Sequence, residues 1–155
     1  GKLEDEYVYS DKGSISTLEI QRIRTMQANG WLQNVDFTAS KDTVLWASFL
    51  TDSRYQNEHL GVYEGACTYS KGAYRPSEDS MMNSNTCAFN APSRKSLYEK
   101  VMKIGMDTEQ VLYEDFVTFD KAHLPEMLPV ASYTRAAFSG QSFARPVWTG
   151  SRLSH

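Results

Sequence analysis

The chain has 155 residues, 41% of them hydrophobic, and carries 16 basic against 19 acidic side chains. That length suits one ordinary domain with a sizeable core, and the net charge of −3 disfavours a nucleic-acid-binding protein, which usually has a basic surface. No apolar run approaches the roughly 20 residues of a membrane-spanning helix, and the chain shows no signal-peptide pattern.

The first predicted element is a helix over residues 17–28. Ser16 and Glu19 have the spacing of a capping box, in which a serine hydroxyl and a glutamate carboxylate bond the free amides at a helix start. Asn29-Gly30 is a typical stop, because both residues tolerate left-handed backbone angles. Four apolar side chains, the second slightly off the common face, are expected to point at the core: Leu18, Ile20, Ile23 and Met26.

The middle of the chain has weaker patterns. The apolar run at residues 44–50 suits a buried strand or a short helix, and periodicity does not decide between them. Residues 61–90 are rich in Gly, Ser and Asn, which predicts a long ordered loop, with a short strand considered at 61–64.

Two more helices are predicted in the next stretch. The first begins near Pro92, which is favoured in a first helical turn, and ends at Gly105. The second covers residues 108–120, with Asp107 as its cap and Gln110 completing a capping box. The expected apolar faces are Leu97, Val101 and Ile104 for the first helix, and Leu112, Phe116 and Phe119 for the second.

The composition changes after Glu126. Residues 1–126 carry 13 basic and 19 acidic side chains, a net charge of −6, whereas the rest has three Arg and no acidic residue. We therefore predict a domain over residues 1–125 and a tail over 126–155. The tail is expected to pack partly on the domain, because it carries aromatic residues: Tyr133, Phe138, Phe143 and Trp148.

Few residues carry recognisable chemistry. His59, His123 and His155 are too far apart in sequence to form a zinc-binding pair on one helix, and no H-E-x-x-H or G-x-S-x-G motif occurs. Cys67 and Cys87 are either a disulfide or two buried thiols. The acidic cluster at residues 4–6 is either a solvated patch or the source of one metal ligand, which would need others from elsewhere.

Five short blocks follow one another within residues 1–105. They are Leu3-Glu4-Asp5-Glu6-Tyr7, Gly30-Trp31-Leu32-Gln33-Asn34-Val35-Asp36, Gly61-Val62-Tyr63-Glu64-Gly65, Tyr74-Arg75-Pro76 leading to Ser80-Met81-Met82, and Phe89-Asn90-Ala91-Pro92-Ser93-Arg94. Taken in order, these blocks resemble the IgA-peptidase family of zinc metallopeptidases, a metzincin-like family found largely in gut bacteria. The resemblance covers about two-thirds of the chain and leaves out the tail.

The resemblance implies a fold and a site. The fold is expected to be α+β, helix-dominated with long ordered loops, like the C-terminal subdomain of a zincin. Asp5 would be the third metal ligand, with Glu6 as a further carboxylate beside it. Ser80 and Met82 would form the Met-turn beneath the metal. In a secreted relative, a bridge between Cys67 and Cys87 would be stable and would pin that turn.

The family's zinc helix is missing from this sequence. In the family, an H-E-x-x-H helix precedes the segment that begins here, and it supplies two histidine ligands and the general base. One Asp cannot hold catalytic zinc, which needs three protein ligands and an open position. We therefore expect zinc in the complete family enzyme, no tight zinc binding by this chain, and no peptidase activity of the chain alone.

Two functions follow from these expectations. The first is the C-terminal portion of a secreted zinc-dependent endopeptidase, located outside the cell, in the periplasm or at the cell surface, and acting on protein or peptide substrates. The second is a non-catalytic binding or interaction module derived from the family. A homo-oligomer is expected as well, because apolar surface that the zinc helix would cover must be hidden in another way. Neither nucleic acid nor a membrane span is expected.

Overall fold

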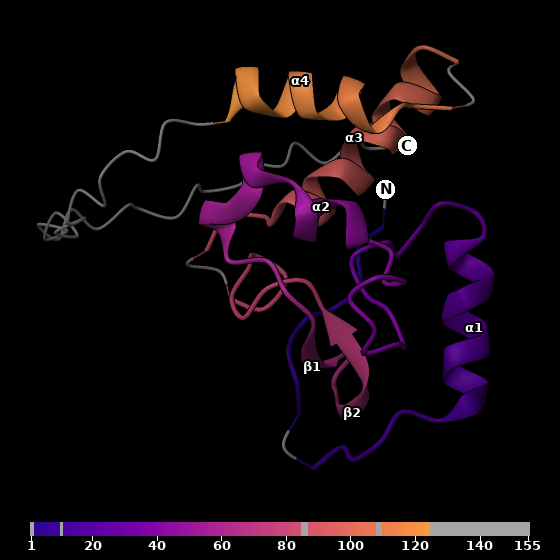
Figure 1. The fold of residues 1–155 in the computed structure, drawn as a ribbon. Coiled ribbons are helices and arrows are strands. Elements are labelled where there is room, and N and C mark those ends of the chain that lie inside the picture. The colour runs from indigo at the N-terminus through magenta and orange to yellow at the C-terminus, as the bar shows by residue number, and fades with distance from the viewer. Residues whose placement is uncertain (1, 10, 85–86, 108–109, 125–155) are drawn as a thin grey trace, which may run out of the picture. The chain divides into compact units, whose positions relative to one another are not determined.

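The computed structural model describes residues 2–9, 11–84, 87–107 and 110–124, and these residues form several helices and one small sheet (Figure 1). In chain order the elements are α1 (Thr17–Gln27), α2 (Ala47–Thr51), the 3-10 helix η1 (Ser53–Glu58), β1 (Tyr63–Ala66), β2 (Tyr69–Arg75), α3 (Ala91–Gly105) and α4 (Tyr113–His123). This mixture of helices with one small antiparallel sheet confirms the predicted α+β class.

Helix α1 follows its sequence signals closely. The Ser16 side chain caps it by accepting a hydrogen bond from the amide of Glu19 at 3.2 Å, and the helix ends at Gln27, with Gly30 left-handed at φ +74°. Only half of the capping box forms, because the Glu19 carboxylate pairs with Arg22 at 2.7 Å.

The buried side of α1 differs in part from the prediction. Ile23 is fully buried, and Ile20 and Met26 pack against the same core cluster. The prediction for Leu18 was wrong, since this side chain is 76% exposed. The helix therefore buries only a narrow stripe, and Leu18 in its first turn faces solvent.

The region predicted to be a loop contains the sheet. Strands β1 and β2 pair in antiparallel fashion, with Tyr63 opposite Arg75 and Ala66 opposite Tyr69. The two residues between the strands, Cys67 and Thr68, have φ of +54° and +69°, the left-handed pair that a tight hairpin turn requires. Neither is Gly or Asn, so the sequence lacked the usual hairpin signal. The apolar run at 44–50 leads into a short helix, α2, which decides between the two alternatives left open for it.

Two clusters of buried side chains form the core. One joins α1 to the hairpin and consists of Ile15, Ile23, Leu32, Val35, Ala66, Cys67 and Ala73. The other joins α2, η1 and the two C-terminal helices and consists of Val44, Trp46, Phe49, Tyr55, Ala91, Phe116 and Val117. The indole of Trp46 also donates a hydrogen bond to the carbonyl of Gly61 at 2.7 Å. The second cluster is thereby tied to the start of the hairpin region.

Helix α3 has the predicted bounds but a different buried face. Asn90 caps it by accepting a hydrogen bond from the amide of Ser93 at 3.0 Å. Its buried residues are small or polar and lie near its start: Ala91, Pro92, Ser93 and Ser96. The predicted apolar face was wrong, because Val101 and Ile104 are 65% and 76% exposed. Only the first half of α3 therefore packs into the core.

Helix α4 begins at Tyr113, five residues later than the prediction. Asp107 and Gln110 precede it and do not form the expected capping box, and Asp107 is left-handed at φ +50°. The Tyr113 hydroxyl donates a hydrogen bond to Asp52 at 3.0 Å, and its ring meets that of Phe49 at a centroid distance of 5.0 Å. Tyr113 thus contacts Phe49 of α2 and Asp52, the residue that follows α2. These contacts hold the first residue of α4 in place.

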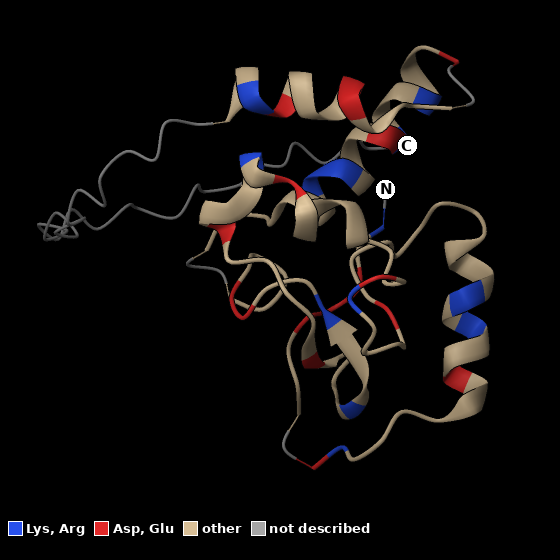
Figure 2. Ribbon diagram, in the orientation of Figure 1, with Lys and Arg blue, Asp and Glu red and all other residues tan. Residues whose placement is uncertain are grey.

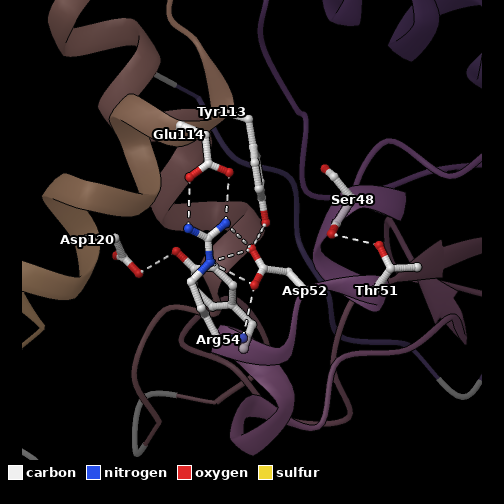
Figure 3. Close-up of polar contacts among 8 residues, drawn as sticks. Ser48, Thr51, Asp52, Arg54, Tyr113, Glu114 and Asp120 are labelled. Carbon is white, nitrogen blue, oxygen red and sulfur yellow. Dashed lines mark hydrogen bonds and ion pairs between the residues drawn. The ribbon is translucent and has the colours of Figure 1, made fainter.

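Ion pairs join α4 to the rest of the domain. Figure 3 shows the guanidinium of Arg54 between two carboxylates, at 2.7 Å from Asp52 and 2.8 Å from Glu114. Arg94 of α3 bonds Asp120 at 2.7 Å and Glu58 at 2.6 Å. Basic and acidic positions accordingly occur on α4 and on the segments that face it (Figure 2). Ion pairs with Arg54 and Arg94 therefore accompany the packing of Phe116 and Val117 where α4 meets the rest of the domain.

Two expectations concern larger features of the chain. The chain divides into two units, Gly1–His123 and Leu124–His155, and the predicted tail at 126–155 lies outside the described residues. Within the described part, none of the helices has the length and apolar character needed to cross a membrane.

Candidate functional site

The first block runs as an extended segment beside the hairpin turn. The amides of Cys67 and Thr68 donate hydrogen bonds to the carbonyls of Asp5 and Tyr7, at 2.8 and 3.1 Å, and the amide of Tyr9 donates to the carbonyl of Thr68 at 3.0 Å. In an extended segment, alternate side chains point to opposite faces. Asp5, Tyr7 and Tyr9 therefore share one face, and Glu6 points to the other.

Glu6 lies at the centre of a buried polar network. Its side chain is fully buried, and its carboxylate accepts hydrogen bonds from the Asn34 amide at 2.9 Å, the Ser80 hydroxyl at 2.5 Å and the Asn90 amide at 3.1 Å. The Ser93 hydroxyl lies 3.4 Å away. We call these five residues the Glu6 network. It brings together four segments that are far apart in the sequence.

The Glu6 carboxyl group is hydrogen-bonded by neutral side chains alone. Burial raises the pKa of this carboxyl, while the hydrogen bonds from its Asn and Ser partners act in the opposite direction. All four partners are amides or hydroxyls, and each donates to the ionised form. The buried carboxylate thus has its oxygens satisfied without a guanidinium or an ammonium group in direct contact with it.

The predicted Met-turn residues lie directly against this segment. Ser80 is buried and donates to Glu6, while the same hydroxyl accepts a hydrogen bond from the amide of Met82 at 3.2 Å. The amide of Glu6 in turn donates to the carbonyl of Met82 at 3.1 Å. The structure therefore brings Ser80 and Met82 next to the Asp5 segment, and their role beneath a metal ion stays a prediction.

Glu6 itself is not available as a metal ligand. The family resemblance implies a further carboxylate beside Asp5 at this position, but the Glu6 side chain is fully buried and both of its oxygens already accept hydrogen bonds. It also points away from the face that Asp5 shares with Tyr7. Glu6 is therefore part of the support for that face.

The face with Asp5 also carries two tyrosines. The rings of Tyr7 and Tyr9 meet edge to face at a centroid distance of 5.3 Å, and their hydroxyl oxygens are 3.4 Å apart. The Tyr9 hydroxyl, followed by the Asp5 carboxylate, raises the pKa of Tyr7 above its ordinary value. Lys12 lies 5.7 Å from the Tyr9 ring centre and bonds the Thr68 hydroxyl at 2.9 Å. The face thus offers one carboxylate with phenolic groups beside it.

Asp5 fits the role of one zinc ligand but does not make a site. Its half-buried carboxylate sits on a segment whose backbone is held at both sides, and carboxylate oxygen is an accepted zinc donor. Among the residues that the structure describes, no group of three or more His, Cys, Asp or Glu side chains could hold a metal ion. The remaining ligands would have to come from outside this set.

The bridge considered between Cys67 and Cys87 is not present. The structure leaves the two sulfur atoms unbonded to each other. Cys67 belongs to the core cluster beneath α1, and burial raises the pKa of its thiol, which keeps it protonated and unreactive. Hydrogen bonds of the Glu6 network and of Met82 hold the turn that the bridge was expected to pin.

The other blocks also hold one another in place. The backbones of Asp36 and Tyr74, from the second and fourth blocks, exchange hydrogen bonds of 3.0 and 2.8 Å, and the Asp36 carboxylate pairs with Arg24 at 2.7 Å. Arg75 donates to the carbonyl of Glu64, in the third block, at 3.1 Å. The polar residues of the five blocks therefore act largely by joining segments.

Sequence reasoning missed the residues of the Glu6 network other than Ser80 and Glu6. Asn34 lies in the second block, and Asn90 and Ser93 lie in the fifth, so each was quoted as part of a motif without a role. The available signal was that buried polar residues need partners, but the partners were not identifiable from a single sequence.

A groove of about 850 Å³ lies between the end of α1 and α3, away from the candidate site, because none of Asp5, Ser80 and Met82 lines it.

From Glu4 onward, the five blocks and the Glu6 network fall within the range of a known protein family. The family model described as IgA peptidase M64 matches residues 4–101, which include the first block from Glu4 onward, the Met82 turn and most of α3. No curated protein and no solved structure matches the chain.

Proposed function

Since the chain belongs to the IgA peptidase M64 family, we propose that it is the C-terminal portion of a zinc-dependent endopeptidase. The observation that carries the proposal is the position of Asp5 on a segment bonded to the Met82 turn, inside the matched residues. A metallopeptidase needs a ligand segment held firmly next to its supporting turn, and Glu6 and Met82 provide that connection here.

The reaction would be hydrolysis of a peptide bond in a protein or peptide substrate. Bound zinc supplies the chemistry by lowering the pKa of a coordinated water molecule. In this chain Asp5 would contribute one ligand, and Tyr7 would stand beside it with a protonated hydroxyl, since its pKa is raised. The two histidine ligands and the general base would come from the H-E-x-x-H helix that precedes this segment in the family.

The decisive experiment combines the gene with an assay. We expect the full reading frame to encode H-E-x-x-H shortly before residue 1, and its product to cleave peptides in a zinc-dependent way. We expect the 155-residue chain to cleave none of a broad peptide library, with or without added zinc. The matched variants are Asp5→Ala, which should abolish activity of the full product, and Asp11→Ala, an exposed control.

Two outcomes would overturn this proposal. Cleavage by the 155-residue chain that a chelator and Asp5→Ala both abolish would mean that the chain holds a complete site. A reading frame that starts near Lys2, or joins a signal peptide directly to it, would favour a non-catalytic binding or interaction module of the same family.

Location and assembly are part of the proposal. We place the enzyme outside the cytoplasm, secreted, periplasmic or at the cell surface, which fractionation of the producing cells tests by its appearance outside the cytoplasmic fraction. Self-association is supported by the exposure of Val101 and Ile104 on α3. A sedimentation experiment that shows only monomer at high concentration would contradict it.

A further inference from the structure

The Glu6 network has an unusual composition for a purely structural contact. Burying an ionised carboxylate is costly unless its oxygens are satisfied, and an apolar side chain of similar size would fill the space without that cost. The network is nevertheless built from residues 28 to 87 positions away from Glu6 in the sequence. Its effect is therefore to specify one arrangement of these segments.

The network acts on the Asp5 segment from the inner side. The carboxylate of Glu6 is held by Ser80 and Asn90, and its amide is held by the Met82 carbonyl. On either side of Glu6 in the chain, the carbonyls of Asp5 and Tyr7 accept hydrogen bonds from the amides of the hairpin turn. The peptide group before Glu6 and the peptide group after Tyr7 are thus held by hydrogen bonds, and the directions in which Asp5 and Tyr7 project follow from this.

Ser80 is the residue that couples the network to the turn. Its hydroxyl donates to Glu6 at 2.5 Å and accepts from the amide of Met82 at 3.2 Å. One hydroxyl group therefore sets the distance between the carboxylate and the turn. A change at Ser80 should displace the Asp5 segment and the turn relative to each other without removing a charge.

We propose that Glu6, acting through Ser80 and its own backbone, is the positioning residue that holds Asp5 and Tyr7 at a defined place above the Met82 turn. Glu6 makes no contact with substrate or metal in this role, because its side chain is fully buried. The inference rests on the proposed function for the meaning of Asp5, but the coupling between Ser80 and the Asp5 segment is a property of this chain alone.

The first test uses the 155-residue chain and amide hydrogen exchange. In Ser80→Ala, we expect the amides of Glu6, Thr68 and Tyr9 to exchange about tenfold faster, the factor that loss of one hydrogen bond to a charged group produces. Ser80→Thr keeps the hydroxyl and should restore much of the protection. Ser96→Ala is the matched control, since Ser96 is equally buried and its hydroxyl has no hydrogen-bond partner among the described residues.

The second test uses the product of the full reading frame and measures the zinc dissociation constant. Ser80→Ala should weaken zinc binding about 10- to 100-fold, the usual effect of losing a group that orients a metal ligand. Ser80→Thr should recover most of this affinity, and Ser96→Ala should leave it unchanged. The absorption spectrum of the cobalt-substituted protein should change in Ser80→Ala alone, because it reports ligand geometry.

The outcomes separate this inference from the proposed function. If Ser80→Ala lowers the melting temperature but leaves amide exchange of the Asp5 segment and zinc affinity like those of Ser96→Ala, the network is merely structural and the inference is wrong. If Asp5→Ala leaves zinc affinity unchanged, the proposed function fails instead, and the exchange experiment still decides whether Glu6 positions the segment.

Discussion

Two buried carboxylates hold this domain together in different ways. Glu6 is bonded by amides and hydroxyls, with Ser80 at 2.5 Å and Asn34 at 2.9 Å. Asp120 of α4 is bonded by the guanidinium of Arg94 at 2.7 Å and by the Tyr55 hydroxyl at 3.1 Å. The first carboxyl group has only neutral hydrogen-bond partners, whereas the second is paired with a guanidinium.

The difference in bonding partners matches the distance of each carboxyl group from the candidate metal ligand, Asp5. A fixed guanidinium beside Asp5 would compete with a metal ion for its carboxylate, because opposite charges within a few ångströms stabilise each other strongly. Neutral donors satisfy Glu6 without bringing such a charge next to the candidate site. At α4 no such conflict exists, and Arg94 can join Asp120 and Glu58 in one contact. The predictions below compare the two regions, from the largest effect to the smallest.

The largest effect is expected for Asn90→Asp. Aspartate caps a helix as well as asparagine does, so α3 keeps its cap, but the donor that faces Glu6 becomes a second carboxylate. We expect the free energy of unfolding to fall by about 3–5 kcal/mol at neutral pH, as for an uncompensated buried charge. Denaturant unfolding measures this, with the exposed Asn57→Asp as the control.

This variant also has a definite pH dependence. Burial already raises the pKa of Glu6, and a second carboxylate raises it further, so the folded state binds a proton that the unfolded state releases. Stability must therefore fall as the pH rises from the ordinary carboxyl pKa towards the raised one. The difference between Asn90→Asp and the original chain should shrink on acidification. A difference independent of pH would show that the two carboxylates do not interact.

The second effect concerns Arg94→Met. The substitution removes the guanidinium but keeps much of the apolar stem, leaving Asp120, which is 5% exposed, without its cation. We expect a loss of about 3 kcal/mol, the lower end for breaking a buried pair, because Arg94 is itself 21% exposed. Thermal unfolding checks this. Arg22→Met, which removes a surface pair within α1, should have almost no effect.

A smaller effect is expected for Arg54→Met, and it should depend on pH. Hydrogen bonds from Arg54 lower the pKa of Asp52 from 3.8 to about 2. This contribution to stability is complete above the ordinary pKa and is lost as the pH falls through the lowered one. Between about pH 4 and pH 2 the original chain should therefore lose more stability than the variant. Equal slopes in acid unfolding curves would contradict the role of Arg54.

The smallest effect is expected for Ser96→Ala. The Ser96 hydroxyl is buried without a hydrogen-bond partner among the described residues, and alanine is the better helix former by about 0.5 kcal/mol. The melting temperature should stay the same or rise slightly. Ser80→Ala, which removes an equally buried serine of the Glu6 network, should lower it. If the two variants behaved alike, the Ser80–Glu6 hydrogen bond would be of no value to stability.

Several features of the chain could be predicted because their causes are local. Ser16 and Gly30 bound α1 through the backbone angles and the amide donors of a single turn, and Pro92 and Gly105 mark the first and last turns of α3. The five blocks identified the family without any knowledge of the fold, since the order of short motifs is itself a property of the sequence. Asp5 and the Met82 turn were named from that order.

The tertiary structure alone decided which side chains are buried and what they bond. Helical spacing predicted an apolar face with Val101 and Ile104, but spacing cannot tell whether another element covers that face, and here none of the described ones does. Glu6 was predicted as a surface carboxylate or a ligand, because its neighbours in sequence are acidic. It is buried because Asn34, Ser80 and Asn90 converge on it from distant positions, and only folding brings such donors together.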